Sequence, residues 1–279
     1  MSPAETKPAK IWSVHWQPPR IVNGSPIVFE VSPPFELKRL TATWLRYDIQ
    51  FSFDKAKRVW YGLAGVSLDT PPGAYTLALN GTTAAGKDVA FQKMVKTSAG
   101  HYPTISIKVP TKFTEPNPEQ QKQIAADKVT KDQAFNRPPS EKEWSGKFLA
   151  PVKSTVTDVF GTRRTLNGKT QTTHQGLDFA AGPGTPVHAV NRGTVILAQP
   201  LYFEGNCVVI DHGGGLLTLY MHLSELRVKE EEQVTRGQEV GLSGGTGRAT
   251  GPHLHLAVRW QGTYLNPETL LRFELPAAP

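Results

Sequence analysis

Turn-forming residues interrupt this chain at short intervals along almost its whole length. The 279 residues include 25 glycines and 23 prolines, which form turn signals such as Asn23-Gly24, Pro71-Pro72-Gly73 and Asn80-Gly81. Turns at this density leave room for many short strands but for few long helices. The sequence therefore predicts a mainly β protein, and its length allows two modest domains, each with its own core.

Residues 11–112 are predicted to form the first domain, an immunoglobulin-like β-sandwich. Apolar and polar residues alternate in Tyr75–Leu79 and Ile105–Val109, as expected of half-buried strands. Several short strands within about 100 residues are typical of an antiparallel sandwich. The cysteine pair of true immunoglobulin domains is absent, so only a general likeness is predicted. The expected strands are Ile27–Val31, Thr41–Phe53, Arg58–Val66, Ala74–Asn80, Val89–Val95 and Ile105–Val109.

Residues 113–147 are predicted to be a linker with one helix. Asn117 offers an N-cap, Pro118 the first helical position and Gln120 the reciprocal partner of a capping box. The stretch Glu119–Phe135 lacks glycine and proline, but it has few large apolar residues. Such a polar helix is expected to separate domains rather than to fill a core. From residue 148 to 279 short strands return, with one further helix expected at Pro267–Leu271.

Charge is distributed unevenly along the chain. The formal net charge is +7, and residues 1–112 alone hold 14 Lys and Arg against 7 Asp and Glu. A basic module beside a neutral one suggests an anionic polymer, such as wall glycan or nucleic acid, as a partner. A basic surface that only aids solubility explains the same pattern. No recognition motif accompanies the charge, so no nucleic-acid partner is expected.

The sequence does not by itself decide the cellular compartment of the protein. No run is long and apolar enough to span a membrane, and the start, MSPAETKPAK, lacks the apolar segment of a signal peptide. The chain is thus either cytoplasmic or a mature form without its leader. Its single cysteine, Cys207, cannot form an internal disulfide, and its apolar neighbours predict a buried strand position.

Six of the eight histidines lie beyond residue 148, and this concentration marks the candidate site. In a strand, His253 and His255 point to the same face, so their rings lie close enough to share a metal ion or to divide metal binding and proton transfer. His174 and Asp178 add one nitrogen and one oxygen ligand from a loop that runs into a strand. Three protein ligands with a fourth position left for water are typical of catalytic zinc.

Two further histidines are expected to transfer protons beside such a metal. His253 and His222, in Tyr220-Met-His222-Leu, can accept the proton of an attacking water or stabilise the tetrahedral intermediate and the leaving amine. Their spacing leaves open which residue has which role. Bound zinc lowers the pKa of water to about 7, so amide hydrolysis at neutral pH is chemically plausible.

The order His174…Asp178…His222…His253-x-His255, with Phe160-Gly-Thr-Arg163 upstream, resembles the lysostaphin/LytM-type zinc metallopeptidases of peptidase family M23. The resemblance extends over residues 148–271 and includes Gly176-Leu-Asp-Phe-Ala180 and Val209-Ile-Asp-His-Gly213. It implies an antiparallel β fold, one Zn²⁺ held by His174, Asp178 and His255, and catalytic roles for His222 and His253. It also implies an endopeptidase that cuts peptidoglycan in the periplasm or outside the cell. The oligomeric state stays open.

Other interpretations remain at this point. The alternative to an active enzyme is a catalytically silent wall-binding or regulatory module of the same fold. The first domain could tether the enzyme to the wall, cover its groove or only act as a spacer. Residues Arg163–Thr173 contain no aromatic residue, which argues against polyglycine as the substrate. The remaining histidines are expected to be structural: His15, His101, His188 and His212. Three aromatic residues either pack in the core or line the groove: Tyr202, Phe203 and Tyr220.

Overall fold

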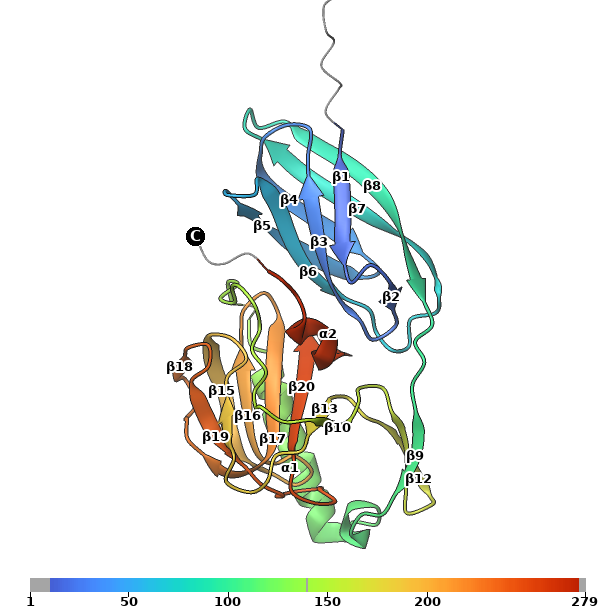
Figure 1. Cartoon of the computed structure of the whole chain (residues 1–279), viewed down its shortest axis with the longest axis vertical. Coiled ribbons are helices and arrows are strands. Elements are labelled where there is room, and N and C mark those ends of the chain that lie inside the picture. Colours follow the sequence, from blue (N-terminus) through green and yellow to red (C-terminus); the bar gives the residue numbers. More distant parts are fainter. Residues whose placement is uncertain (1–10, 139, 276–279) are drawn as a thin grey trace, which may run out of the picture.

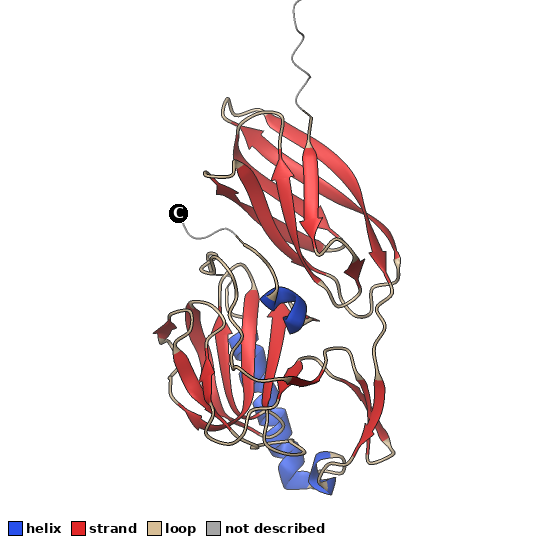
Figure 2. Cartoon of the chain, viewed as in Figure 1, coloured by secondary structure: helices blue, strands red, loops and turns tan. Residues whose placement is uncertain are grey.

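Two β-rich domains lie one above the other along the long axis of the molecule (Figure 1). The computed structural model describes residues 11–138 and 140–275, and strands make up most of both domains (Figure 2). The predicted mainly β fold class, with a sandwich joined through a helix to an antiparallel peptidase-like domain, is confirmed. The start of the chain, for which the sequence predicts no signal peptide, and Pro139 of the predicted linker lie outside the described residues.

The first domain is a β-sandwich whose two sheets share strand β5 (Tyr47–Asp54). The first half of β5 pairs with β4 and its second half with β6, so this strand passes from one sheet to the other. Phe29, Trp44 and Leu79 are fully buried between the sheets. The immunoglobulin-like assignment stays a prediction. The remaining strands are β1 (Ser13–Gln17), β2 (Ile21–Val22), β3 (Pro26–Ser32), β4 (Leu37–Trp44), β6 (Val59–Gly65), β7 (Gly73–Thr83) and β8 (Asp88–Ser98).

One predicted strand of this domain is wrong. The stretch Thr41–Phe53 was expected to be continuous, but Leu45 and Arg46 form a two-residue turn between β4 and β5. Leu45 has φ 57°, a left-handed conformation that favours glycine or asparagine. Neither residue of this turn is a typical turn former, so the hairpin has no local signal in the sequence.

The segment after β8 joins the two domains by a parallel strand pair. Strand β9 (Thr104–Ile107) lies within the range predicted for the first domain, yet it pairs with β11 (Arg163–Leu166) of the second. With β12 (Thr170–Thr173) these strands form a small three-stranded sheet beside the second domain. A short 3-10 helix, η1 (Thr111–Phe113), follows β9.

Helix α1 (Pro118–Phe135) begins with the predicted capping box. The Asn117 side chain accepts from the Gln120 amide, and the Gln120 side chain accepts from the Asn117 amide. Of its described side chains only Ala134 is buried, where the helix lies on the outer face of the large sheet (Figure 1). Lys131 of α1 also forms an ion pair with Glu204 at 2.5 Å. The helix is therefore polar, as predicted, and is fixed to the second domain.

The second domain is built on one large antiparallel sheet. Its strand order is β10-β13-β20-β17-β16-β15-β18, with β14, β19 and β21 attached at its sides. The predicted helix α2 (Pro267–Leu271) follows β21. Strands β13, β20 and β17, side by side within the sheet, supply most of the candidate site. The bounds are β10 (Val156–Asp158), β13 (Leu177–Phe179), β14 (Pro186–His188), β15 (Gly193–Leu201), β16 (Gly205–Asp211), β17 (Leu216–Leu226), β18 (Gln233–Val234), β19 (Glu239–Ser243), β20 (Leu254–Trp260) and β21 (Thr263–Leu265).

The two domains contact each other directly as well as through β9. The Asn266 amide donates to the Gly24 carbonyl at 2.8 Å, and the hydroxyls of Tyr47 and Thr263 lie 2.5 Å apart. Leu265 packs so closely on Gly65 that a Cβ there would lie 2.6 Å from a Leu265 methyl carbon. A side chain at residue 65 would therefore force this contact apart.

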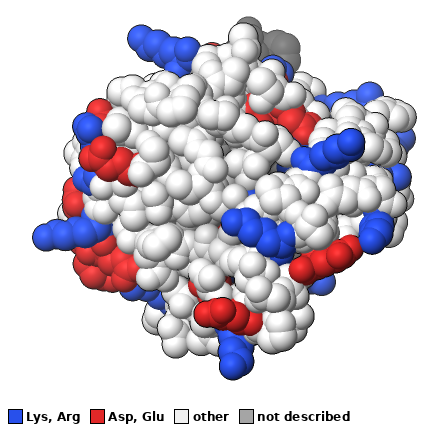
Figure 3. All heavy atoms as spheres, turned by 90° about the horizontal axis from the view of Figure 1, so that it is seen from below, with Lys and Arg blue, Asp and Glu red and all other residues white. Residues whose placement is uncertain are grey.

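Charges of both signs surround an uncharged centre when the molecule is seen from below (Figure 3). This view shows no large patch of a single sign, which agrees with the balanced charge of residues 148–279. Among the described helices, none has the length and apolar character needed to cross a bilayer.

Candidate metal centre and its groove

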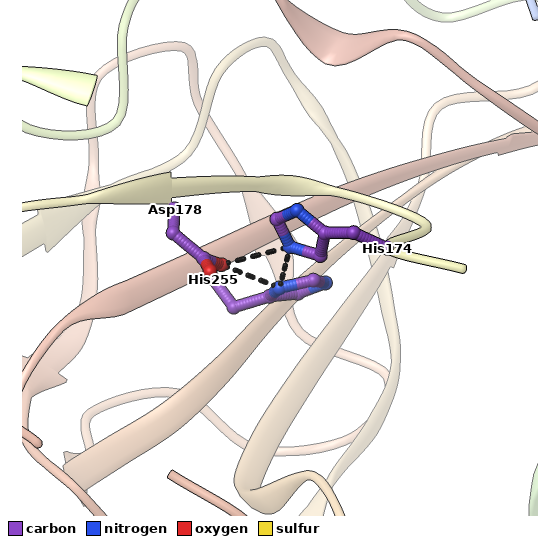
Figure 4. Close-up of side chains that lie close together, drawn as sticks. All are labelled: His174, Asp178 and His255. Carbon is purple, nitrogen blue, oxygen red and sulfur yellow. Dashed lines mark hydrogen bonds and ion pairs between the residues drawn. The ribbon is translucent and has the colours of Figure 1, made fainter. Parts of the chain in front are cut away.

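Three side chains converge on one point between β13 and β20 (Figure 4). Asp178 on β13 and His255 on β20 are directly paired across the strands, and His174 lies in the loop before β13. The His255 Nδ1 and Asp178 Oδ1 atoms lie 2.8 Å apart, and His174 Nε2 lies 3.0 Å from each of them. Strand pairing and one short loop therefore bring residues 174, 178 and 255 into a single cluster.

The three facing atoms fit a metal ion. His174 Nδ1 donates to the Val159 carbonyl at 2.9 Å, which leaves a lone pair on Nε2 of the neutral ring. That lone pair faces a carboxylate oxygen, an arrangement that is repulsive unless a cation lies between them. Donor atoms around tetrahedral zinc lie roughly 3.3 Å apart, given bonds of about 2.0–2.1 Å. The observed triangle is a few tenths of an ångström tighter, so the cluster can hold one ion.

A glycine makes room for this cluster. A Cβ at Gly176 would lie 2.3 Å from His255 Nε2 and 2.6 Å from the Leu256 carbonyl oxygen. Any larger residue at 176 would displace either the His255 ring or the β20 backbone. The predicted loop that runs into a strand between His174 and Asp178 is confirmed, and this close approach explains its glycine.

Arg164 contacts Asp178 on the oxygen that does not face the two histidines. The sequence did not predict a role for this residue. Its guanidinium donates to Asp178 Oδ2 at 2.7 Å and, through Nε, to Asp158 Oδ2 at 2.9 Å. Burial raises the pKa of Asp178, but a proton on the facing nitrogen of His174 or His255 lowers it far more, so this carboxyl stays ionised. Arg164 therefore fixes one carboxylate oxygen and leaves the other turned to the metal position.

His222 and His253 lie beside the cluster, as expected. Their ring centroids are 4.8 Å apart, and the His222 ring is 6.0 Å from that of His255. His222 Nδ1 donates to the Thr246 carbonyl and His253 Nδ1 to the Gly251 carbonyl, both at 2.8 Å. In neutral rings these bonds leave Nε2 free to accept a proton. Burial, then the neighbouring His255 and His253, lowers the pKa of His222 to about 3.

The backbone at His222 adopts a conformation that is rare for such a residue. Its φ is 63°, in the left-handed region, although it lies within strand β17. Its amide donates to the Glu204 carbonyl at 2.8 Å, which stabilises this geometry. Non-glycine residues in this region often mark functional sites, because the surrounding structure must offset the strain.

Two cavities, of about 690 and 490 Å³, meet at the cluster and together form a groove. Ile105 and Ile107 of β9 line the first, and Phe203 and Tyr264 line the second. Phe203 is therefore one of the three aromatic residues predicted as possible groove residues that does line the groove. Tyr202 packs on Phe113 with ring centroids 5.4 Å apart. The residues shared by both cavities are Arg164, Thr172, His222, Arg248 and His255.

Comparison with known proteins identifies the second domain. Residues 172–267 match Peptidase family M23. The chain carries a peptidase family M23 domain. This domain includes all five predicted site residues, although the match itself assigns no roles to them. Helix α1 and strand β9 precede the matched range, so part of the groove wall lies outside it.

Relatives of the M23 domain include two proteins of Vibrio cholerae. The peptidoglycan DD-endopeptidase ShyA is 38% identical over 147 residues, which are 52% of this chain and 31% of that protein. ShyC, another peptidoglycan DD-endopeptidase, is 44% identical over 105 residues, or 38% and 24% of the two chains. The chain thus spans about a quarter to a third of the length of these relatives.

A crystal structure from Pseudomonas aeruginosa resembles the chain as a whole. It is described as a candidate M23 peptidase, and the match covers 90% of this chain and 95% of the other. The sequences are 28% identical and the TM-score is 0.67. The combination of an N-terminal β domain with the M23 domain is therefore shared with this protein.

The cysteine, Tyr220 and the histidines that the sequence placed outside the site lie away from the metal cluster. Cys207 is buried in β16, as predicted, and burial raises the pKa of its thiol. Tyr220 is fully buried and its hydroxyl accepts from the Val190 amide at 2.9 Å, so it belongs to the core of the M23 domain. His188 is half-buried on β14, and His15 and His101 are exposed in the other part of the chain.

His212, for which the sequence predicts a structural role, is fully buried. Its Nδ1 donates to the Arg192 carbonyl at 2.7 Å, and its Nε2 lies 2.7 Å from the Thr218 hydroxyl. The ring is fully buried, and this burial lowers its pKa to about 4.

The M23 domain is expected to lose stability in mild acid because of His212. Its folded pKa, about 4, lies below the unfolded value, so the unfolded chain binds more protons between these two pH values. Stability contributed by neutral His212 is therefore present at pH 7 and is lost as the pH falls, by about 2 kcal/mol at pH 5. Urea unfolding of the wild type and His212→Gln at both pH values measures this loss. Equal losses in the two proteins would contradict it.

Proposed function

We propose that this chain is a zinc-dependent endopeptidase that hydrolyses peptide bonds in the stems or cross-bridges of peptidoglycan. One observation carries the proposal: a three-donor metal cluster and two histidines, each with its Nδ1 bound to a backbone carbonyl, face the same groove. A metal cluster alone would fit a structural site. The free Nε2 atoms beside it are what hydrolysis needs in addition.

His174, Asp178 and His255 would hold the zinc ion. When bound there, zinc supplies Lewis-acid polarisation of the scissile carbonyl and makes a water acidic enough to attack at neutral pH. Arg164 keeps the Asp178 carboxylate oriented, and the Val159 carbonyl fixes the His174 tautomer. These contacts mean that the ligand geometry exists before substrate arrives, which limits the reorganisation needed for reaction.

His222 and His253 would move the protons. Each ring holds its Nδ1 proton against a backbone carbonyl and presents Nε2 as the acceptor. One of the two would take the proton of the attacking water on its Nε2, and this proton, shared with the facing ring, would then stabilise the tetrahedral intermediate and pass to the leaving amine. Their centroid separation of 4.8 Å is short enough for both to act on a single scissile bond.

The choice of peptidoglycan rests on the relatives. The V. cholerae proteins named peptidoglycan DD-endopeptidases match over the same M23 domain. Two cavities meet at the cluster, so a peptide substrate could extend from it in both directions. A cell-envelope location, in the periplasm or outside the cell, follows for an enzyme with this substrate.

Digestion of purified peptidoglycan by the full chain tests the proposal. Mass spectrometry of the soluble products should show fragments with new amino termini within the peptide part, and none with broken glycan bonds. A chelator should stop their release, and added Zn²⁺ should restore it. Wall binding without any new amino terminus would favour the catalytically silent module instead.

A further inference from the structure

Arg248 occupies a distinctive place in the groove. It lies in the loop between β19 and β20 and lines both cavities that meet at the metal cluster. Its amide donates to the Phe203 carbonyl at 2.8 Å, and its guanidinium carbon lies 4.9 Å from the centre of the Phe203 ring. Backbone and side chain are thus both fixed against Phe203, so the guanidinium is held in place at the groove wall.

The neighbouring cations are already paired, whereas Arg248 is not. Arg164 contacts Asp158 at 2.5 Å and Asp178 at 2.7 Å, and Lys131 contacts Glu204 at 2.5 Å. Glu204 is the acidic group that most affects Arg248; its Oε1 is paired with Lys131, and its buried Oε2 has no hydrogen-bond partner, Arg248 included. Across residues 11–138 and 140–275, the Arg248 guanidinium forms neither an ion pair nor a side-chain hydrogen bond.

A half-buried guanidinium without an ion pair loses hydration free energy, and a bound ligand that accepts its hydrogen bonds would offset this loss. Burial lowers the pKa of Arg248, yet a guanidinium stays charged at any physiological pH. Its five donors lie in one plane and match the two oxygens of a carboxylate. A partly dry groove also strengthens such a charge-assisted pair, compared with one in bulk water.

We propose that Arg248 binds a free carboxylate of the peptide substrate next to the scissile bond. This inference rests on the proposed function, and it narrows the substrate class to peptides that carry a carboxylate close to the cleaved amide. A C-terminal carboxylate and a side-chain carboxylate share this chemistry. Neutral bridges, such as polyglycine, would leave Arg248 without a partner and are therefore poor substrates.

Matched peptides and variants test the proposal through turnover. A synthetic cross-linked stem peptide is compared with two twins, one amidated at its C-terminus and one at its side-chain carboxyl. For the wild type, one of the twins should lose roughly 10- to 100-fold in kcat/KM, mainly through KM, as expected for a hydrogen-bonded charge. The twin that loses activity identifies which carboxylate Arg248 binds.

Arg248→Gln should remove this preference, so that acid and amide twins are cleaved at similar rates. Arg248→Lys should keep part of it, because the charge remains but the planar fork is lost. Arg163→Gln is the control, since Arg163 is exposed on the same small sheet as Arg164 and lines neither groove cavity. An equal loss for acid and amide in Arg248→Gln would overturn the proposal, as would a wild type with no preference.

Calorimetric binding separates this proposal from the proposed function. A non-hydrolysable reduced-amide peptide and its amidated twins are titrated into the wild type and Arg248→Gln. Tighter binding of the acid by the wild type, lost in the variant, supports Arg248 as the carboxylate site even if no peptide is ever cleaved. Equal affinity of acid and amide for the wild type would refute it, whatever the turnover results.

Discussion

Replacing His255 with alanine is expected to remove both the metal and the peptidase activity. Two of the three donor atoms would remain, His174 Nε2 and Asp178 Oδ1, and the face of the site toward β20 would be open. Loss of a Lewis acid costs several kcal/mol of transition-state stabilisation, and about 4 kcal/mol corresponds to a ~10³-fold lower rate. Zinc content by atomic absorption and kcat/KM on a stem peptide measure the two effects.

The matched control for His255 is His188→Ala. His188 is a half-buried strand histidine of the same domain, but it lines neither cavity of the groove. This variant should bind zinc at the wild-type stoichiometry and keep its rate. If His255→Ala also retained stoichiometric zinc and wild-type turnover, the assignment of the metal cluster would be wrong.

Replacing His222 with alanine should instead separate catalysis from metal binding. The His222 ring centroid lies 6.0 Å from that of His255, and its pKa of about 3 keeps the ring neutral near pH 7. Loss of a general acid or base typically lowers kcat by ~10²- to 10⁴-fold. Zinc content and substrate affinity should stay close to those of the wild type.

Zinc analysis decides how a loss of activity in His222→Ala is to be understood. An inactive variant with full zinc supports the proton-transfer role. An inactive variant that has lost zinc would make His222 a ligand or a structural support of the cluster. A variant with full zinc and an unchanged rate would exclude any proton-transfer role for this residue, and His253→Ala would then be the variant to examine.

The sequence predicted the cluster because its determinants are local. His253 and His255 share a strand face at i and i+2, and a short loop ending in Asp178 follows His174, so spacing alone limits where these side chains can point. Their meeting across β13 and β20 could not be read from spacing. It depended on the resemblance of the ordered set to M23 peptidases.

Arg164 and Arg248 show what sequence patterns leave out. Arg164 directly follows the Phe160–Arg163 motif and Arg248 lies in a loop, yet an arginine is usually a solvated surface residue. Their importance comes from tertiary placement, which brings Asp158 to one and Phe203 to the other. The Leu45 hairpin was missed for a related reason, because long-range pairing of β4 and β5 overrides weak local turn preference.

The parallel pairing of β9 with β11 divides the groove between two stretches of sequence. The metal cluster and the two histidines proposed to transfer protons lie in the range matched by the M23 family, whereas the apolar wall of Ile105 and Ile107 lies more than 60 residues before it. Relatives that share only the M23 range need not inherit this wall. Substrate choice can therefore evolve by exchange of the preceding segment while the chemistry stays fixed, and grafting that segment onto another M23 domain would transfer a preference rather than an activity.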